Sequence, residues 1–335
     1  ECIKNQDYDH NNMEVVLVDG ASTDNTRALM CEFALDNKDE FRRVVVLDNP
    51  KKTLPSGWNV ALREYKGDAI IKVDAHAVIP EDFVSKNVRV LETGEYICGG
   101  QRPNIIDKPT PFKETLLLAE SSMFGSSIAS YRNNPGKTYV KSLFHAAYRR
   151  EVFEKVGFFN EELVRTEDNE IHYRMRKAGY KLCFDPDIIS YQYTRSSLKA
   201  MLKQKYANGY WIGKTSKVCP KCLSIYHFVP FAFVSAIIAS GSVIGATGLA
   251  ECIKKRHNHT LGKGISALRK VTVVLTTVMW VLYALMASGM AAVSAFKAED
   301  KRNITNACLP VLFLLLHLSY GIGTIAGLMD KSKRG

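Results

Sequence analysis

Acidic residues are scarce in the last third of the chain, and this scarcity divides the sequence into two unlike parts. Nearly all of the 34 Asp and Glu residues lie within residues 1–224. Three long apolar runs occupy most of the remainder, and each has the length of about 20 residues that a helix needs to cross a bilayer. The runs are Ile225–Leu249, Val271–Phe296 and Ala307–Leu328. The sequence therefore predicts a soluble head followed by a membrane-attached region.

A framework of paired cysteines is also missing. The eight cysteines are scattered without the spacing that disulfide-rich secreted domains have. The single Cys-x-x-Cys pair, Cys219 and Cys222, lacks the second ligand pair of a structural zinc site. We expect reduced, unpaired thiols in a linker that faces the cytosol. The chain has neither an initiator Met nor a charged-then-apolar leader, and we expect it to be truncated at its front.

The net charge of +11 would suit a nucleic-acid partner, but the positions of the basic residues argue against one. Many Lys and Arg residues lie just before or between the apolar runs, where they suit an anionic membrane surface. We therefore expect membrane lipids, and no nucleic acid, among the partners. With 46% hydrophobic and 24% charged residues, the chain is not expected to be disordered.

The first half of the head alternates short apolar runs with helical segments. Strands are predicted over Met13–Val18, Val44–Leu47 and Ala69–Val73, with helices between them. This alternation indicates βαβ units and a mainly parallel sheet. In such sheets ligands bind beyond the carboxyl ends of the strands, which is where Asp19 and Asp74 lie. The head is therefore expected to be an α/β domain with a ligand site at this edge.

The second half of the head ends in a cluster of carboxylates. The pattern predicts a helix over Lys113–Ser122, a loop over Met123–Lys137, a strand over Tyr139–Ala147 and a helix over Arg150–Val156. A further helix is predicted to open with Thr166-Glu167-Asp168-Asn169-Glu170 and to run through Lys177. Acidic residues at a helix start are favoured by the helix dipole, so a purely structural role stays open. Glu167, Asp168 and Glu170 nevertheless crowd one turn with more carboxylates than capping requires. This excess indicates a functional site.

Four motifs occur in an order and at a spacing that resemble one enzyme family. They are Val18-Asp19-Gly20-Ala21-Ser22-Thr23-Asp24, Pro55-Ser56-Gly57-Trp58-Asn59-Val60-Ala61, Asp74-Ala75-His76 and Thr166-Glu167-Asp168. Together they resemble the family 2 glycosyltransferases with a GT-A fold, and most of all the succinoglycan-biosynthesis type of bacterial exopolysaccharide transferases. Gly20 and His76 stand where the family has Asp, and Trp58 stands where it often has Arg. The resemblance implies a Rossmann-like, mainly parallel sheet whose first strand precedes residue 1.

The resemblance also assigns roles to residues of the head. Asp168 matches the family's catalytic base, and Glu167 is expected to orient it or to contact the acceptor. Contacts to the nucleotide sugar are expected from Asp19, Ser22, Asn59 and Asp74. A divalent cation, Mg²⁺ or Mn²⁺, would offset the charge of the departing diphosphate, with Asp74 and His76 as its ligands. Packing of His76 in its loop and a turn role for Ser22 stay open as structural alternatives.

A segment between the head and the apolar runs has the pattern of a helix that lies at a membrane surface. Its apolar and aromatic side chains recur at helical spacing, and its lysines lie on other faces. The apolar set is Leu198, Met201, Leu202, Tyr206, Tyr210 and Trp211. Packing of this helix in a soluble core is the alternative. Gln204 and Trp211 loosely match the membrane-proximal Gln-x-x-Arg-Trp of processive synthases, which assigns them to the acceptor or membrane side and argues against processivity.

We therefore divide the chain into three parts. Residues 1–195 are expected to form the GT-A domain, 196–224 an interfacial helix and linker, and 225–330 a transmembrane region with two or three spans. The positive-inside rule, by which Lys and Arg gather on the cytoplasmic side, bears on the number of spans. Three spans would place nine of the flanking Lys and Arg residues on each side of the membrane. A re-entrant first run would place fifteen of them inside, and its Pro and Gly residues would suit a broken helix. Small residues also pack transmembrane helices, so both arrangements stay open.

These motifs predict a membrane-bound inverting glycosyltransferase. It would move a sugar from a nucleotide-diphosphate donor, expected to be a UDP-sugar, to a lipid-linked or other saccharide acceptor in exopolysaccharide or cell-surface glycan synthesis. Two alternatives are transfer to polyprenyl phosphate itself and a catalytically inactive membrane scaffold. The chain is expected to be a multi-pass protein of the plasma (inner) membrane with a cytoplasmic head.

Overall fold

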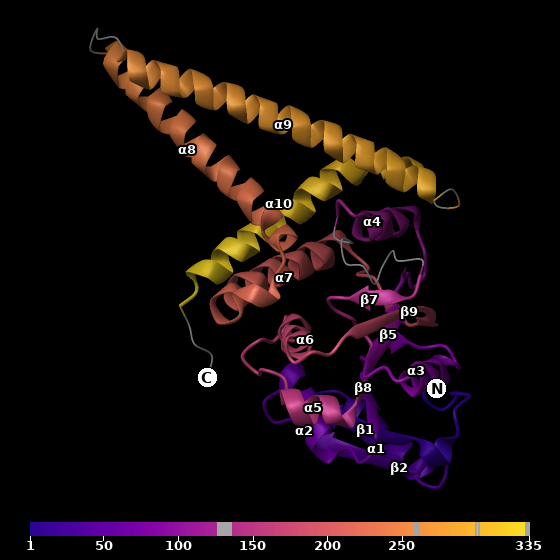
Figure 1. Ribbon diagram of the computed structural model, residues 1–335. Helices are drawn as coiled ribbons and strands as arrows, with labels where there is room; N and C mark the ends of the chain where they lie inside the picture. The colour runs from indigo at the N-terminus through magenta and orange to yellow at the C-terminus, as the bar shows by residue number, and fades with distance from the viewer. Residues whose placement is uncertain (126–135, 257–261, 299, 301, 332–335) are drawn as a thin grey trace.

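The computed structural model describes residues 1–125, 136–256, 262–298, 300 and 302–331. Residues 126–135 of the loop expected over 123–137 lie outside the described residues. The chain forms an α/β head, mostly indigo to magenta in Figure 1, with long C-terminal helices in orange and yellow on one side of it. The expected α/β head with a helical C-terminal region is confirmed.

The chain enters the head through a parallel strand pair. Strands β1 (Glu14–Asp19) and β2 (Arg43–Asp48) are both rich in Val and Leu, which favour the extended, half-buried backbone of a strand. Helix α1 (Thr26–Asp36) connects them, and α2 (Leu54–Glu64) follows with Pro55 in its first turn, where a missing N–H is tolerated. The predicted strands and helices of this region are therefore confirmed to within a few residues.

A five-stranded sheet forms the centre of the head, in the order β3-β8-β5-β9-β7. Its strands are β3 (Ala69–Ile71), β5 (Ile97–Gln101), β7 (Thr138–Val140), β8 (Ala146–Arg149) and β9 (Leu182–Ile189). Only the β5–β9 pair is parallel in it, because β8 runs antiparallel between β3 and β5 and β7 runs antiparallel at the edge. The sheet is thus mixed where we expected a mainly parallel one. The single strand predicted over 139–147 is in fact two strands, β7 and β8, at separate positions of the sheet.

Further elements cover this sheet. A smaller sheet joins β4 (Ala77–Val78), β10 (Tyr191–Tyr193) and β6 (Asn104–Ile105). The helices of the head are α3 (Phe83–Glu92), α4 (Pro111–Ser121), α5 (Arg150–Val156) and α6 (Glu167–Lys177). The core between α5, α6 and the sheet is built on fully buried side chains such as Tyr148, Ile171 and Phe184. This core fixes α6, and with it the carboxylates of its first turn.

The C-terminal region contains three helices that are long and apolar enough to cross a membrane. They are α8 (Val229–Arg256), α9 (Lys263–Lys297) and α10 (Leu309–Met329). Helix α8 is continuous through Gly241, Gly245 and Gly248, so the broken segment expected of a re-entrant run is absent. Pro230 lies in the first turn of α8, where it interrupts no helical hydrogen bond.

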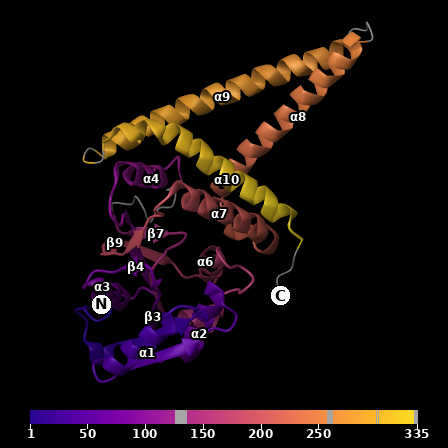
Figure 2. The same ribbon diagram turned by 180° about the vertical axis from the view of Figure 1, so that it is seen from behind.

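Helix α10 differs from α8 and α9 because it packs lengthwise on α7 (Leu198–Val218), as Figures 1 and 2 both show. The two backbones approach so closely that only glycine fits at several positions. A Cβ on Gly213 would lie 2.5 Å from Thr324 O, and one on Gly327 would lie 2.0 Å from Tyr210 O. In the most apolar stretch of each helix, 39% of the residues are buried in α10, against 6% in α8 and 11% in α9. Helix α10 is therefore joined to the head by way of α7.

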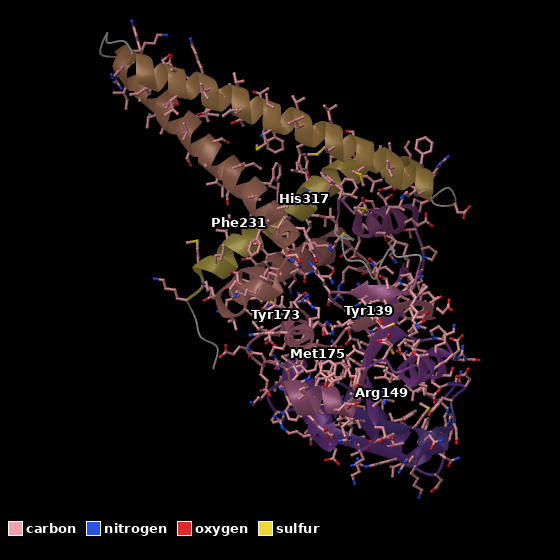
Figure 3. The ribbon with its side chains drawn as sticks, in the orientation of Figure 1. Tyr139, Arg149, Tyr173, Met175, Phe231 and His317 are labelled. Carbon is pink, nitrogen blue, oxygen red and sulfur yellow. The ribbon has the colours of Figure 1, made fainter. Side chains whose placement is uncertain are left out.

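The first turn of α8 meets α10, after which the two helices diverge (Figure 1). A Cβ on Gly321 of α10 would lie 2.4 Å from Pro230 O, which marks the point of contact. His317, labelled on α10 in Figure 3, binds Tyr283 of α9 through Nδ1 (2.9 Å) and the Phe124 carbonyl through Nε2 (2.7 Å). These bonds join α9 and α10 to the residues that follow α4.

Candidate active site

The centre of the site is a buried lysine among carboxylates. Lys72 follows β3, and its Nζ donates a 2.7 Å hydrogen bond to Oδ1 of Asp168. Its Nζ also lies 3.8 Å from Oε1 of Glu167 and 5.1 Å from the centre of the Trp58 ring. The Lys72 side chain is 5% exposed and that of Asp168 is 19% exposed. One edge of the Asp168 carboxylate therefore stays within reach of a second molecule.

Burial and the neighbouring charges both shift the pKa values of the residues in this cluster. Burial alone would lower the pKa of Lys72, but the charges of Asp168, Glu167 and Asp74 outweigh it and raise that pKa. Burial raises the pKa of Glu167 to about 8, and the charge of Asp168 adds to this effect. Near neutral pH the cluster thus contains a charged Lys72 and a protonated Glu167. Asp168 is the carboxylate that Lys72 holds in place.

Asp74 belongs to the same cluster and has a histidine behind it. Its backbone N–H donates to Nε2 of His145 (3.4 Å), and its Oδ2 lies 3.7 Å from the same nitrogen. The other ring nitrogen, Nδ1, binds the Ser190 hydroxyl at 2.8 Å. Burial would raise the pKa of Asp74, but the hydrogen bond to His145 and the charge of Lys72 lower it to about 2. Asp74 is therefore ionised at every physiological pH.

The residues around Asp74 fit a divalent cation in part. Its Oδ1 is buried without a hydrogen-bond partner in the described part of the chain, and a carboxylate oxygen is the ligand that Mg²⁺ and Mn²⁺ prefer. His76 is exposed, and its Nε2 accepts a 2.7 Å hydrogen bond from the Gln192 amide. Among the described residues no three His, Cys, Asp or Glu side chains gather into a metal site. A cation on Asp74 would thus take its other ligands from phosphate oxygens and water.

Asp19 and Ser22, two of the residues expected to contact the nucleotide, form a turn at the end of β1. Asp19 ends β1, and its carboxylate accepts the Ser22 N–H at 3.2 and 3.3 Å, so Ser22 serves the turn while its side chain faces solvent. The turn contains Ala21 at φ 57°, a strained left-handed conformation for a residue with a Cβ. Among the described residues no hydrogen bond or ion pair links Asp19 to the Lys72 cluster. The structure thus brings Asp74, Glu167 and Asp168 together but leaves this turn separate.

The Asn59 side chain is used to hold a loop. Its Nδ2 donates to the Phe159 carbonyl (2.9 Å) and to Glu161 Oε1 (2.8 Å), and its Oδ1 accepts the Phe159 N–H (2.8 Å). Asn59 is 2% exposed. These bonds fasten α2 to the segment that leads into α6, and the expected contact of Asn59 with the nucleotide stays a prediction.

Helix α7 presents one face to the start of α6. Asn208 accepts a 3.1 Å hydrogen bond from Arg165, and the hydroxyls of Thr215 and Thr166 are bonded to each other. Gln204 and Trp211 lie one turn from Asn208 on the same face, because residues three or four apart are neighbours on a helix. The Gln204 Oε1 is buried and has no hydrogen-bond partner among the described residues. The two predicted acceptor-side residues therefore share the face of α7 that abuts the start of α6.

Sequence analysis missed two residues of the site. Lys72 has a local signal, since it is the charged residue of the otherwise apolar run Ala69–Val73. His145 has none, because it reaches Asp74 only when β8 pairs antiparallel with β3. Its partner Ser190 comes from the end of β9, still farther along the chain.

Comparison with known proteins finds relatives of the head. Residues 1–157 match the family described as Glycosyl transferase family 2. The match covers slightly less than half of the chain, and the head is similar to a glycosyl transferase family 2 domain. The relatives that it matches include glycosyltransferases and proteins named for polysaccharide or glycan synthesis. Members of this family generally depend on a divalent cation and use a nucleotide sugar and a saccharide acceptor.

Two curated relatives and one solved structure illustrate the similarity. The succinoglycan biosynthesis protein ExoA of Rhizobium meliloti (strain 1021) is 30% identical over 203 residues, which cover 59% of this chain and 59% of that protein. The dolichyl N-acetyl-alpha-D-glucosaminyl phosphate 3-beta-D-2,3-diacetamido-2,3-dideoxy-beta-D-glucuronosyltransferase of Methanococcus voltae is 26% identical over 249 residues, or 71% of this chain and 75% of that protein. The crystal structure of S. aureus TarS 1–349 in complex with UDP has a TM-score of 0.41 and 18% identity, covering 63% of this chain and 59% of that one. A TM-score this low carries no argument about single residues. The chain spans about three fifths of the length of the ExoA relative.

Proposed function

We propose that this glycosyltransferase is membrane-bound and inverting, and that it transfers a sugar from a UDP-sugar to a lipid-linked saccharide. The observation that carries the proposal is the Lys72 cluster, in which an ionised Asp74 and a partly exposed Asp168 belong to one buried group of charges. A donor-side carboxylate next to a base is the arrangement that direct displacement at a sugar carbon requires.

Asp168 is the base of the proposed reaction. An acceptor hydroxyl gives its proton to the Asp168 carboxylate as its oxygen attacks the anomeric carbon of the donor. The new carbon–oxygen bond forms on one face of the sugar while the bond to the diphosphate breaks on the other, so an α-linked donor gives a β-linked product. Two relatives carry β linkages in their names, which agrees with this outcome. Lys72 holds the Asp168 carboxylate in place through its hydrogen bond.

Asp74 stands on the donor side. A divalent cation held by Asp74 would supply positive charge to the departing diphosphate. His145 accepts the backbone N–H of Asp74, and Ser190 in turn binds the imidazole. Asp19 and its turn at the end of β1 are proposed to contact the base or ribose of the nucleotide, with Ser22 shaping that turn.

The proposed placement in the membrane follows from helix packing. Helices α8 and α9 cross the bilayer, whereas α10 lies along α7 against the cytoplasmic head, because a helix bound lengthwise to the head is not free to span. Twelve Lys and Arg residues of the flanking segments then lie on the cytoplasmic side and six on the other, as the positive-inside rule favours. A site beside the bilayer suits a lipid-linked acceptor, and one relative is named for transfer to a dolichyl-phosphate-linked sugar.

Two substitutions test the proposal when transfer and UDP binding are measured on the same preparations. Asp168→Asn should lower the transfer rate by a factor of about 10² to 10⁴ while UDP binding in Mg²⁺ stays near the wild-type value, because only the base is removed. Asp74→Asn should weaken the Mg²⁺-dependent binding of UDP as well. Near-normal turnover by the Asp168 variant would refute the assignment, and a lipid-linked saccharide should serve as acceptor where bare polyprenyl phosphate does not.

A further inference from the structure

A small polar cavity lies where the head passes into the first apolar helix. It has a volume of about 90 Å³ and is bounded by α6, the residue after β7 and the turns Pro220–Cys222 and Ile225–Phe228. These turns connect α7 to α8, and Tyr173 in Figure 3 marks α6 beside them. The lining residues that can bind a ligand are Lys141, Ser142, Asn169, Arg176, Lys221 and Ser224.

The formally charged side chains that line this cavity are all cationic. Three of its lining side chains, Lys141, Arg176 and Lys221, are cationic, and its lining includes no carboxylate. Among the described residues no carboxylate lies within ion-pair distance of any of the three. The nearby Glu170 is bound to Arg174 by two hydrogen bonds of 2.6 and 2.8 Å. Three cations that share one cavity repel each other, so an anion bound among them would be favoured.

The rest of the lining suits a phosphate group. Asn169 and Arg176 lie seven residues apart on α6 and so share one face, next to the face that carries Asp168. A guanidinium offers paired donors to phosphate oxygens, and amide and hydroxyl groups add further donors. The cavity is well below the ~300 Å³ of a pocket for a whole small-molecule ligand, so it admits a head group and not a nucleotide sugar.

We propose that this cavity binds the phosphate group of a membrane lipid, in addition to the donor and acceptor sites. Basic pockets at the cytoplasmic face of membrane proteins bind phosphate head groups in this way. That a lipid supplies the phosphate group rests on the proposed placement of the membrane, because the turn Ile225–Phe228 leads directly into α8 at the cytoplasmic surface. A bound phosphate would hold α6, and therefore Asp168, at a fixed height above the bilayer.

The test measures binding to the full chain in dodecyl maltoside by calorimetry, without donor or acceptor. Three probes are compared: dihexanoyl phosphatidic acid, dihexanoylglycerol and inorganic phosphate. The phosphatidic acid should bind, the uncharged glycerol lipid should not, and inorganic phosphate should bind more weakly. Arg176→Gln and Lys221→Gln should each raise the Kd for phosphatidic acid about tenfold, because each removes a charge-assisted hydrogen bond. Lys221 is exposed, so its variant keeps the test valid if the Arg176 variant fails to fold.

Lys177→Gln is the matched control, since Lys177 is exposed, lies next to Arg176 on α6 and does not line the cavity. Its Kd should stay within about twofold of the wild-type value. An equal loss in this control, or equal binding of the uncharged lipid, would overturn the phosphate site. Inorganic phosphate that binds as tightly as phosphatidic acid would overturn the lipid as source. Because the assay needs neither turnover nor a bilayer, its failure is distinct from a failure of the proposed reaction.

Discussion

Two lysine–carboxylate contacts of the head have the same length and very different surroundings. Lys72 Nζ lies 2.7 Å from Asp168, and Lys51 Nζ lies 2.7 Å from Glu161. The Lys72 side chain is 5% exposed, whereas that of Lys51 is 70% exposed. The exposed pair exchanges its partner for water at little cost, whereas among the described residues Lys72 is the one cation within ion-pair distance of Asp168 and Glu167.

We therefore expect the two substitutions to differ strongly in effect. Lys72→Gln should lower the free energy of unfolding by about 3–5 kcal/mol, since it leaves buried carboxylates unpaired. Lys51→Gln should lower it by less than about 1 kcal/mol. Denaturant unfolding of both variants in the same detergent measures the difference. Equal losses would show that Lys72 is as well solvated as a surface lysine.

Glu167 gives the head a pH dependence of known sign. The unfolded chain ionises this carboxyl near its ordinary pKa of 4.5, whereas the folded chain keeps the proton until about pH 8. The folded state binds the additional proton between these values, so the free energy of unfolding falls as the pH rises from 4.5 to 8. Glu167→Gln cannot ionise, and its Tm should fall less than that of the wild type between pH 5 and pH 8. The exposed Glu162→Gln variant should keep the wild-type slope, and a Glu167 variant that also keeps it would contradict the raised pKa.

At the scale of elements, the interface between α7 and α10 depends on glycine. A Cβ at position 327 would overlap the Tyr210 carbonyl, whereas a Cβ at Gly241 of α8 meets no atom within 4 Å. Gly327→Ala should therefore cost about 1–3 kcal/mol, because the helices must separate. Gly241→Ala should be neutral or stabilise by up to about 1 kcal/mol. Thermal unfolding in detergent compares the two, and a neutral Gly327→Ala would mean that α10 is not held against α7.

The elements that sequence patterns predicted are those whose signals are local. Helices α5 and α6 match the predicted bounds to within one residue, because their starts and apolar spacing can be read within one segment. Strands β5 and β9, both in the central sheet, were missed. β5 contains Gly99 and Gly100 and β9 contains Pro186, residues that disfavour strands. The reason for Gly100 is long-range: a Cβ there would lie 2.0 Å from the Ile188 carbonyl.

The candidate site likewise contains residues that local sequence signals predicted and residues that they did not. Asp74, Glu167 and Asp168 could be predicted because each lies in a short motif at the end of a strand or the start of a helix. The partners that set their charge states, Lys72 and His145, reach them only through the pairing of β3 with β8 and the packing of α6. Their role depends on contacts between segments about 70 to 100 residues apart, which periodicity within one segment does not record.

For the whole molecule, the proposed placement of the helices predicts which positions are accessible from outside. The experiment uses an impermeant maleimide on intact cells, in a chain whose exposed cysteines are replaced by serine. Gly264→Cys, at the start of α9, should be labelled from outside, and Lys331→Cys, after α10, only after permeabilisation. Three spans would expose both positions, and a re-entrant α8 would expose neither. Either pattern would contradict the arrangement in which α8 and α9 alone cross.

The interface between α7 and α10 also sets the order of events during synthesis. Helix α7 ends at Val218 and α10 begins at Leu309, with α8 and α9 made between them. At about 5–20 residues per second, α10 emerges on the order of 5–20 s after α7 is complete. The glycine face of α7 stays uncovered for that interval while α8 and α9 are made. The lengthwise contact between α7 and α10 is therefore among the last contacts of the chain to form.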